Sequence, residues 1–283
     1  MGRDPEVAAL GALVAGNVER ALEALGGGAD RPLLSAALRT YLAAAADGRV
    51  YDRPAAFTAF IRGGGNLRLY EAVSTALAER YDRLGVTSLL DIGCGDGRAL
   101  APALAQAGVA PAVTLVEPSR ALLEAAHAAL GREVTAHATD ATTFAANLDQ
   151  RFDLAESTFA LHALPPEERT ELLTALRGHV SHLVLAEFDV PGHPPGGPEH
   201  LTFLADTYEQ GLTEYDDDRD LVAQGFLMPV LAGQLAPGAR RSTWEQPATE
   251  WAEQLTACGY RDVTVEPLCD YWSSPAFLLT AAS

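Results

Sequence analysis

The stretch that decides the fold is residues 89–97, which read LLDIGCGDG. An apolar run over residues 86–92 leads into three glycines spaced as G-x-G-x-G. A short apolar run that ends in glycine predicts a buried β-strand. Glycines at a strand-to-helix turn let the backbone approach a ligand that a Cβ atom would block. The stretch therefore predicts a ligand-binding turn at the carboxyl end of a strand.

Strand and helix patterns alternate from this turn onward. Strands are predicted over residues 86–92, 113–117, 133–138, 152–156 and 182–188, and helices over residues 97–107, 119–130 and 166–178. A helix over 244–257 and two strands near 261–267 and 275–280 close the chain. Strands separated by helices of this length predict a mostly parallel sheet with helices on both faces, which is a doubly wound α/β fold.

Two segments depart from this alternation. The first 84 residues have helical spacing and no strand pattern, with one helix predicted over 6–25 and a second one that ends at Ala46. A third helix carries Leu69, Tyr70 and Leu84 on one face. Residues 189–243 begin with a loop rich in Pro and Gly, pass through an acidic run and contain an apolar segment. We expect a helical region over 1–84 and an α/β domain over 85–283 with an insertion at about 189–243.

Composition excludes several classes of function. The chain has 20 basic residues, all of them Arg, against 38 acidic ones, for a net charge of -18. Without Lys there is no Schiff-base chemistry and no Walker P-loop, and a field this negative repels nucleic acid. The three cysteines form no CxxC pair, which disfavours a disulfide framework or a zinc ribbon. With no secretory pattern and no apolar run of about 20 residues, we expect a cytoplasmic protein with no membrane contact.

The acids around the glycines indicate the ligand. Glu117 lies 20 residues beyond Gly97 at the end of the next predicted strand, where an acid can take the two ribose hydroxyls of an adenosine ligand. Asp91 lies two residues before the first glycine. A carboxylate there serves a pyrophosphate poorly but tolerates a ligand that carries an ammonium and a sulfonium. The spacing is also not the G-x-G-x-x-G of dinucleotide sites, which disfavours a nicotinamide-dependent oxidoreductase.

This stretch resembles the first motif of class I S-adenosylmethionine-dependent methyltransferases. The resemblance covers about residues 66–188 and, more loosely, 244–283. It implies a Rossmann-like sheet of seven strands with an antiparallel last strand, S-adenosylmethionine as cofactor and S-adenosylhomocysteine as product. The implied cofactor-binding residues are Tyr70, Asp91, Gly93, Gly95, Glu117, Pro118, Asp140, Ala141 and Ser157. For Asp140 the resemblance implies a contact with the adenine amino group, and capping of the next turn is the alternative.

His162 is the candidate catalytic base. It lies in residues 156–165, which resemble the "LHHLP" segment of small-molecule methyltransferases with Ala163 in place of the second His. A neutral imidazole after a sheet strand can take a proton near pH 7, and a packing role is the alternative.

Glu187, Asp189 and His193 have side chains that could hold a divalent metal. We expect them to be solvated loop residues instead, and no metal site is predicted.

The regions over 1–84 and 189–243 are expected to form a helical lid over an acceptor pocket. Candidate acceptor-binding residues are the aromatic side chains Tyr208, Tyr215, Tyr271 and Trp272, with packing inside the lid as the alternative for each. The sequence thus predicts methyl transfer to a small molecule of specialised metabolism, with the acceptor atom undetermined. Open alternatives are cyclisation or another non-methyl reaction, a nicotinamide-dependent oxidoreductase, and a non-catalytic cofactor-binding regulator. A homodimer also stays open.

Overall fold

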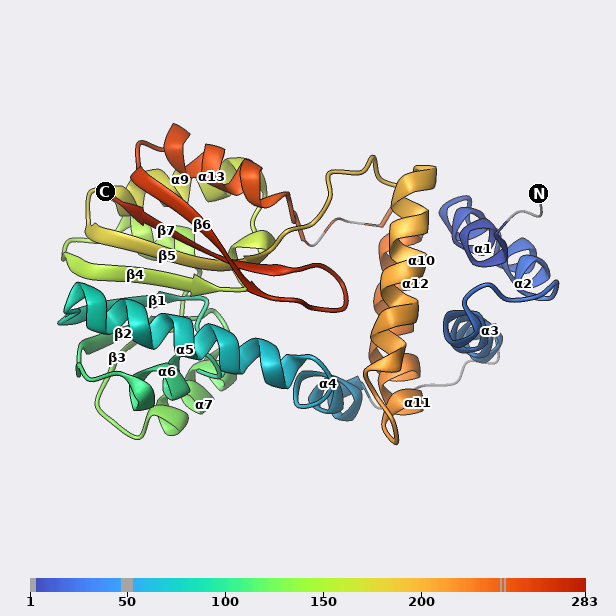
Figure 1. Cartoon of the computed structure of the whole chain (residues 1–283), viewed down its shortest axis with the longest axis horizontal. Helices are drawn as coiled ribbons and strands as arrows, with labels where there is room; N and C mark the ends of the chain where they lie inside the picture. The colour runs from blue at the N-terminus through green and yellow to red at the C-terminus, as the bar shows by residue number, and fades with distance from the viewer. Residues whose placement is uncertain (1–3, 47–52, 240, 242) are drawn as a thin grey trace. The chain divides into compact units, whose positions relative to one another are not determined.

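The computed structural model of the chain describes residues 4–46, 53–239, 241 and 243–283 (Figure 1). Its contacts divide the chain into two compact units. The first unit comprises residues 1–67, 192–241 and 271–274, and the second comprises residues 68–191, 242–270 and 275–283. The sequence-based division at residue 84, and the lid role given to the helical regions, stay predictions.

The second unit is built on a sheet of seven strands in the order β3-β2-β1-β4-β5-β7-β6. The strands are β1 (Ser88–Ile92), β2 (Ala112–Val116), β3 (Thr135–His137), β4 (Phe152–Thr158), β5 (Val180–Phe188), β6 (Arg261–Cys269) and β7 (Ala276–Ala282). The first five pair in parallel, whereas β7 is antiparallel to β5 and to β6. This topology confirms the predicted doubly wound, mostly parallel sheet.

Helices cover both faces of this sheet (Figure 1). On one face lie α5 (Asn66–Leu84), α6 (Leu100–Gln106) and α7 (Arg120–Leu130), and on the other lie α9 (Pro166–Arg177) and α13 (Ala248–Ala257). Helix α8 (Ala141–Ala146) packs in the same cluster as α9. Side chains along β1 alternate between these layers, as the pleat requires. Leu89 lies in a cluster with Tyr81 of α5, and Leu90 lies in a cluster with Leu172 of α9 and Trp251 of α13.

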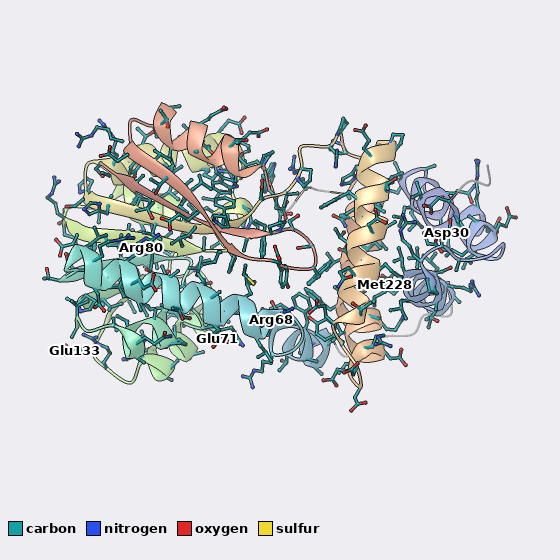
Figure 2. All side chains as sticks on the ribbon, viewed as in Figure 1. Asp30, Arg68, Glu71, Arg80, Glu133 and Met228 are labelled. Atoms are coloured by element: carbon teal, nitrogen blue, oxygen red, sulfur yellow. The ribbon has the colours of Figure 1, made fainter. Side chains whose placement is uncertain are left out.

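One cation of α5 reaches the antiparallel end of the sheet. Arg80, labelled on this helix in Figure 2, donates to a carboxylate oxygen of Glu266 in β6 at 2.5 Å and to the hydroxyl of Thr280 in β7 at 3.4 Å. The Arg80 side chain is 5% exposed, whereas that of Glu266 is 54% exposed. Arg80 therefore links α5 to the last two strands.

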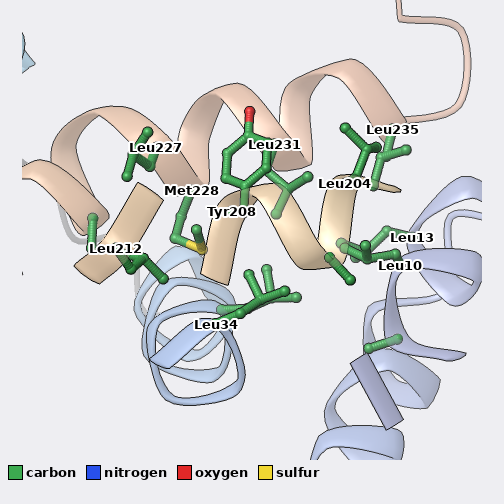
Figure 3. Packing of buried hydrophobic residues seen from close by; sticks show 14 of the residues in the cluster. Leu10, Leu13, Leu34, Leu204, Tyr208, Leu212, Leu227, Met228, Leu231 and Leu235 are labelled. Carbon is green, nitrogen blue, oxygen red and sulfur yellow. The ribbon is translucent and has the colours of Figure 1, made fainter. Parts of the chain in front are cut away.

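The first unit is helical. It contains α1 (Pro5–Val14), α2 (Val18–Leu25), α3 (Pro32–Ala46), α4 (Arg53–Ile61), α10 (Pro198–Thr213), α11 (Arg219–Val222), a π-turn at Ala223–Leu227 and α12 (Met228–Leu235). Its core joins Leu10, Leu34, Leu204 and Met228, from four different helices (Figure 3). Among the described residues, no helix combines the length and the apolar character that a membrane span needs.

Three helical details differ from the sequence-based expectations. The single helix predicted over 6–25 is wrong, because Gly16 has a φ of 70° and breaks it into α1 and α2. Asn17 then caps α2 by accepting from the N–H of Arg20 at 2.9 Å. Helices α4 and α8 are absent from the sequence-based expectations. They have nine and six residues, which is too short for a helical period to stand out in a sequence.

Adjacent leucines on α7 test the packing against the sheet. Leu123 is 7% exposed and lies in the cluster of Leu89, whereas Leu122 is 43% exposed. We expect Leu123→Ala to lower the free energy of unfolding by about 2–4 kcal/mol through lost burial and a residual cavity. Leu122→Ala, the matched control, should change it by less than about 0.5 kcal/mol. Urea titrations followed by circular dichroism measure both, and equal effects of the two substitutions would contradict this packing.

Candidate functional site

The glycine turn leaves β1 in a conformation that only glycine adopts without strain. Gly93, Gly95 and Gly97 have φ angles of 71°, 53° and 75°. A Cβ atom on Gly93 would lie 2.6 Å from the Cβ atom of Ala160, whereas one on Gly95 would meet no atom within 4 Å. The N–H of Gly93 donates to the carbonyl of Val116 at 2.8 Å. The turn is therefore fastened to the end of β2 and leaves open space beside Gly95.

Glu117 lies directly against this turn. One carboxylate oxygen accepts from the N–H of Gly95 at 3.2 Å, and the other accepts from the N–H of Ser119 at 2.9 Å. The residue is 8% exposed. Each oxygen has a second lone pair, so both can still accept hydrogen bonds from a ligand. Binding of ribose by Glu117 stays a prediction, and its position beside the glycines is the one that prediction needs.

Asp91 lies below the turn, in the sheet itself. It is 2% exposed, and its Oδ1 atom has no hydrogen-bond partner in the described part of the chain. In the register of β1 and β4 it stands opposite Glu156. Burial, followed by the charge of Glu117, raises the pKa of Asp91 to about 7. This aspartate is therefore poised to change its protonation state near neutral pH.

The other predicted cofactor-binding residues outside the glycine turn differ in their burial and in their hydrogen-bond partners. Asp140 caps α8, since its carboxylate accepts from the N–H of Thr143 at 2.8 Å and from two threonine hydroxyls. These bonds, that of the Thr143 N–H first, lower the pKa of Asp140 to about 2. Ala141 is the first residue of α8, and Pro118 is exposed after β2. Ser157 is buried and donates to the carbonyl of Ile92 at 2.7 Å, so its hydroxyl hydrogen is used inside the sheet.

Three aromatic rings lie together near the ends of β4 and β5. Phe159 stacks on Phe188 with ring centroids 4.6 Å apart, and the ring of Tyr70 meets Phe159 edge-on at 6.1 Å. Phe159 holds a φ of 52°, a strained conformation that the surrounding structure must maintain. Its N–H donates to the carbonyl of Ala186 at 2.8 Å. Sequence reasoning named Tyr70 but missed both phenylalanines, whose only sequence clue is their place at strand ends.

His162 forms a pair with Glu187. The Nδ1 atom of His162 lies 2.8 Å from one carboxylate oxygen of Glu187, and the N–H of His162 donates to the other at 3.2 Å. The histidine side chain is 17% exposed and the glutamate side chain 2% exposed. The expectation that Glu187 is a solvated loop residue is wrong, because Glu187 is the penultimate residue of β5 and is buried.

The charge of Glu187 controls the protonation of His162. Burial works to lower the pKa of His162, but the charge and hydrogen bond of Glu187, helped by Glu245, outweigh it and raise the pKa above 6.5. Arg169 opposes this increase. Because Glu187 holds Nδ1, the other ring nitrogen is the one left to exchange a proton with a ligand.

Arg169 fixes the segment around Trp244 and Gln246, which contacts the backbone of His162. Its guanidinium is buried, lies 4.0 Å from the ring centroid of Trp251 and donates to the carbonyl of Trp244 at 3.2 Å. It also donates to the side chain of Gln246 at 2.6 Å. The N–H of Trp244 in turn donates to the carbonyl of His162 at 2.6 Å. Sequence reasoning missed this arginine, which fixes the backbone of the candidate base.

The four aromatic acceptor candidates meet within the first unit. Trp272 contacts Tyr208 at 5.5 Å and Tyr271 at 5.7 Å between ring centroids. The side chain of Asn66 accepts from the hydroxyl of Tyr271 at 3.1 Å and donates to that of Tyr215 at 3.3 Å. Tyr208 and Tyr215 are buried, which favours the packing alternative for these two. A role in acceptor binding stays a prediction for all four.

The side chains considered for a metal have other partners. Glu187 binds His162. Asp189 accepts from the N–H of Ala248 at 2.8 Å, and the Nδ1 atom of His193 lies 3.7 Å from a carboxylate oxygen of Glu199. Glu187 and Asp189 therefore hold parts of the fold, whereas the carboxylate beside His193 is 79% exposed.

Comparisons with known proteins agree with this geometry. Residues 89–182 match the family model described as "Methyltransferase domain". A search of curated proteins gave no match. Among solved structures, the chain resembles magnesium protoporphyrin IX methyltransferase from Synechocystis with bound S-adenosylhomocysteine, at a TM-score of 0.50 and 16% identity over 75% of this chain and 82% of the other. It also resembles mitomycin 7-O-methyltransferase, at a TM-score of 0.51 and 19% identity over 99% and 74%.

At these identities the solved structures support the fold alone. The family model supports more, since its match begins in β1 and includes the glycine turn, Glu117 and His162. The chain therefore carries a methyltransferase domain, and the resemblance read from the glycine turn is confirmed.

The interaction between His162 and Glu187 can be tested without a substrate, through the pKa of His162. In a nuclear magnetic resonance titration we expect the pKa of His162 to lie above 6.5. In Glu187→Gln it should fall below the wild-type value, because burial then acts with less opposition. The His162→Gln variant assigns the resonance. Since folding raises this pKa, the pair stabilises the fold fully below pH 6.5 and loses that contribution as the pH rises through the folded value. An unchanged pKa in Glu187→Gln would exclude the assigned interaction.

Proposed function

We propose that the protein transfers a methyl group from S-adenosylmethionine to a hydroxyl oxygen of a small molecule. The observation that carries the proposal is the arrangement of β1, β4 and β5. These are adjacent parallel strands, so their carboxyl ends meet at one edge, where ligands of open α/β sheets bind. The glycine turn follows β1, His162 follows β4 and Glu187 is the penultimate residue of β5.

The residues at this edge fit the proposed cofactor. The open space beside Gly95 admits a ligand close to the backbone. Glu117 offers free lone pairs for two sugar hydroxyls, and the carboxyl group of Asp91, two residues before Gly93, suits an ammonium group bound at the turn. When bound, the cofactor supplies an electrophilic methyl group on sulfur. What the protein must add is alignment and the exclusion of water.

His162 and Glu187 support an acceptor that must lose a proton. A hydroxyl becomes a good nucleophile as its proton leaves, and a neutral imidazole can take that proton. Glu187 keeps a proton on Nδ1, so the free ring nitrogen can act as the base, and Glu187 stabilises the imidazolium that forms. The rate should rise with pH through the pKa of His162, which lies above 6.5.

The choice of a small acceptor has two supports. Phe159, three residues before His162, and Phe188, next to Glu187, place apolar rings at the ends of β4 and β5, which favours a flat or apolar acceptor. The name of the similar mitomycin 7-O-methyltransferase is that of an enzyme that methylates oxygen. We extend the proposal to specialised metabolism in the cytoplasm, without nucleic acid. A homodimer stays an open expectation.

Glu117 provides the test of cofactor binding. We expect Glu117→Gln to weaken the binding of S-adenosylhomocysteine by about 2 kcal/mol, or roughly thirtyfold, because a neutral amide replaces a charged acceptor. Isothermal titration calorimetry measures the affinity. Glu124→Gln, an exposed position on α7, is the matched control and should bind as the wild type does. Unchanged affinity in Glu117→Gln would refute the ribose assignment.

His162 provides the test of the reaction. Incubation with S-adenosylmethionine and a panel of phenols and alcohols should give a product about 14 Da heavier by mass spectrometry, whereas a cyclase would not add this mass. His162→Gln should lower turnover at least about a hundredfold and leave the affinity for S-adenosylhomocysteine nearly unchanged. Turnover at the wild-type rate in this variant would leave His162 a packing role only.

A further inference from the structure

Two buried carboxyl groups stand side by side inside the sheet. Asp91 of β1 and Glu156 of β4 are register partners in adjacent parallel strands. They are 2% and 0% exposed. Because side chains alternate along a strand, both lie on the face that also carries Leu89 and Leu154, which pack towards α5. Acidic side chains are rarely fully buried, so the burial of Glu156 in β4 needs a physical explanation.

The partners of the pair are unequal. The hydroxyl of Tyr81, on α5, lies 2.8 and 2.6 Å from the two carboxylate oxygens of Glu156. The Oδ1 atom of Asp91, by contrast, has no hydrogen-bond partner among the described residues. Glu156 is thus held by the protein, whereas Asp91 keeps a buried oxygen without a partner.

Every titratable group that faces Asp91 in the described structure is acidic. Tyr81 faces it from α5, Glu156 from β4, Glu117 from the end of β2 and Cys94 from the glycine turn. None of these groups brings a positive charge, and a buried carboxylate without a cation is costly. Two adjacent buried carboxyls therefore do not both ionise in the free protein.

The two groups differ in which one keeps its proton. Burial and the charge of Asp91 raise the pKa of Glu156 well above its usual value, although the bond from Tyr81 works against this. The pKa of Asp91 is raised to about 7. Burial therefore favours the protonated form of Glu156, and we assign the titrating proton of the pair to Asp91.

We propose that Asp91 couples cofactor binding to proton release: it is partly protonated in the free protein and becomes a carboxylate when the ammonium group of the cofactor binds at the glycine turn. This inference rests on the proposed function. The O–H bond of the Asp91 carboxyl breaks, its electron pair stays on oxygen, and the proton leaves to the buffer. The ammonium group stays protonated, so no other bond changes. Glu156, held neutral by burial and bonded to Tyr81, is a positioning residue beside Asp91.

The coupling can be measured by isothermal titration calorimetry of the full chain with S-adenosylhomocysteine. Titrations in two buffers of different ionisation enthalpy, at each pH, give the number of protons released. For a carboxyl with a pKa of about 7, we expect about 0.9 proton at pH 6, about 0.5 at pH 7 and almost none at pH 8.5. The dissociation constant should be about tenfold larger at pH 6 than at pH 8.

A second ligand and two variants make the test specific. 5′-Methylthioadenosine lacks the amino-acid group, and its binding should release no proton from Asp91. Asp91→Asn should abolish the release with S-adenosylhomocysteine. Glu156→Gln copies the neutral form of Glu156 and should keep the release. Circular dichroism checks that both variants fold, and the comparison of the two ligands on the wild-type protein tests the coupling even if Asp91→Asn does not fold.

The outcomes separate this inference from the proposed function. Absence of binding by S-adenosylhomocysteine at every pH would refute both. Binding with no proton release would overturn only the inference, as would equal release with 5′-methylthioadenosine or in Asp91→Asn. Loss of the release in Glu156→Gln would also overturn it, because the proton would then belong to Glu156.

Discussion

The parallel pairing of β1 with β2 on one side and β4 on the other is the constraint on which the site depends. Parallel strands end at the same edge, and the pairing brings Glu117, at the end of β2, against the glycine turn that ends β1. The same pairing sets Asp91 opposite Glu156. The parallel pairing of β4 with β5 brings His162 within hydrogen-bond distance of Glu187. One register thus positions both halves of the proposed chemistry.

Electrostatics at this edge follow from burial more than from the total charge of -18. An acid in water keeps its usual pKa, but inside the sheet it must have a cation, donate to or accept hydrogen bonds, or stay neutral. Glu117 accepts two N–H groups, and Glu187 has the imidazole of His162. Asp91 has neither kind of partner for Oδ1. This difference is the physical reason to assign a mobile proton to Asp91 and fixed roles to the others.

The fold could be predicted from the sequence because each strand and helix is indicated by the pattern of apolar residues within its own short segment. Apolar runs of strand length that alternate with helical periods indicate a parallel sheet wherever they occur. The failures were local too. Gly16 divides a helix whose apolar spacing continues on both sides, and α8 has only six residues. For the candidate site, the glycines and Glu117 were predictable from spacing, whereas Arg169 was one of many arginines on predicted helices.

By itself, the sequence determined the order of the elements, the glycine turn and the class of domain, since each depends on neighbouring residues. The tertiary structure decided which distant side chains meet. His162 and Glu187 are 25 residues apart, and Tyr81 and Glu156 are 75 apart. Such pairs depend on strand register and on how a helix lies across the sheet. A local pattern does not encode either of these, because many registers bury the same apolar residues.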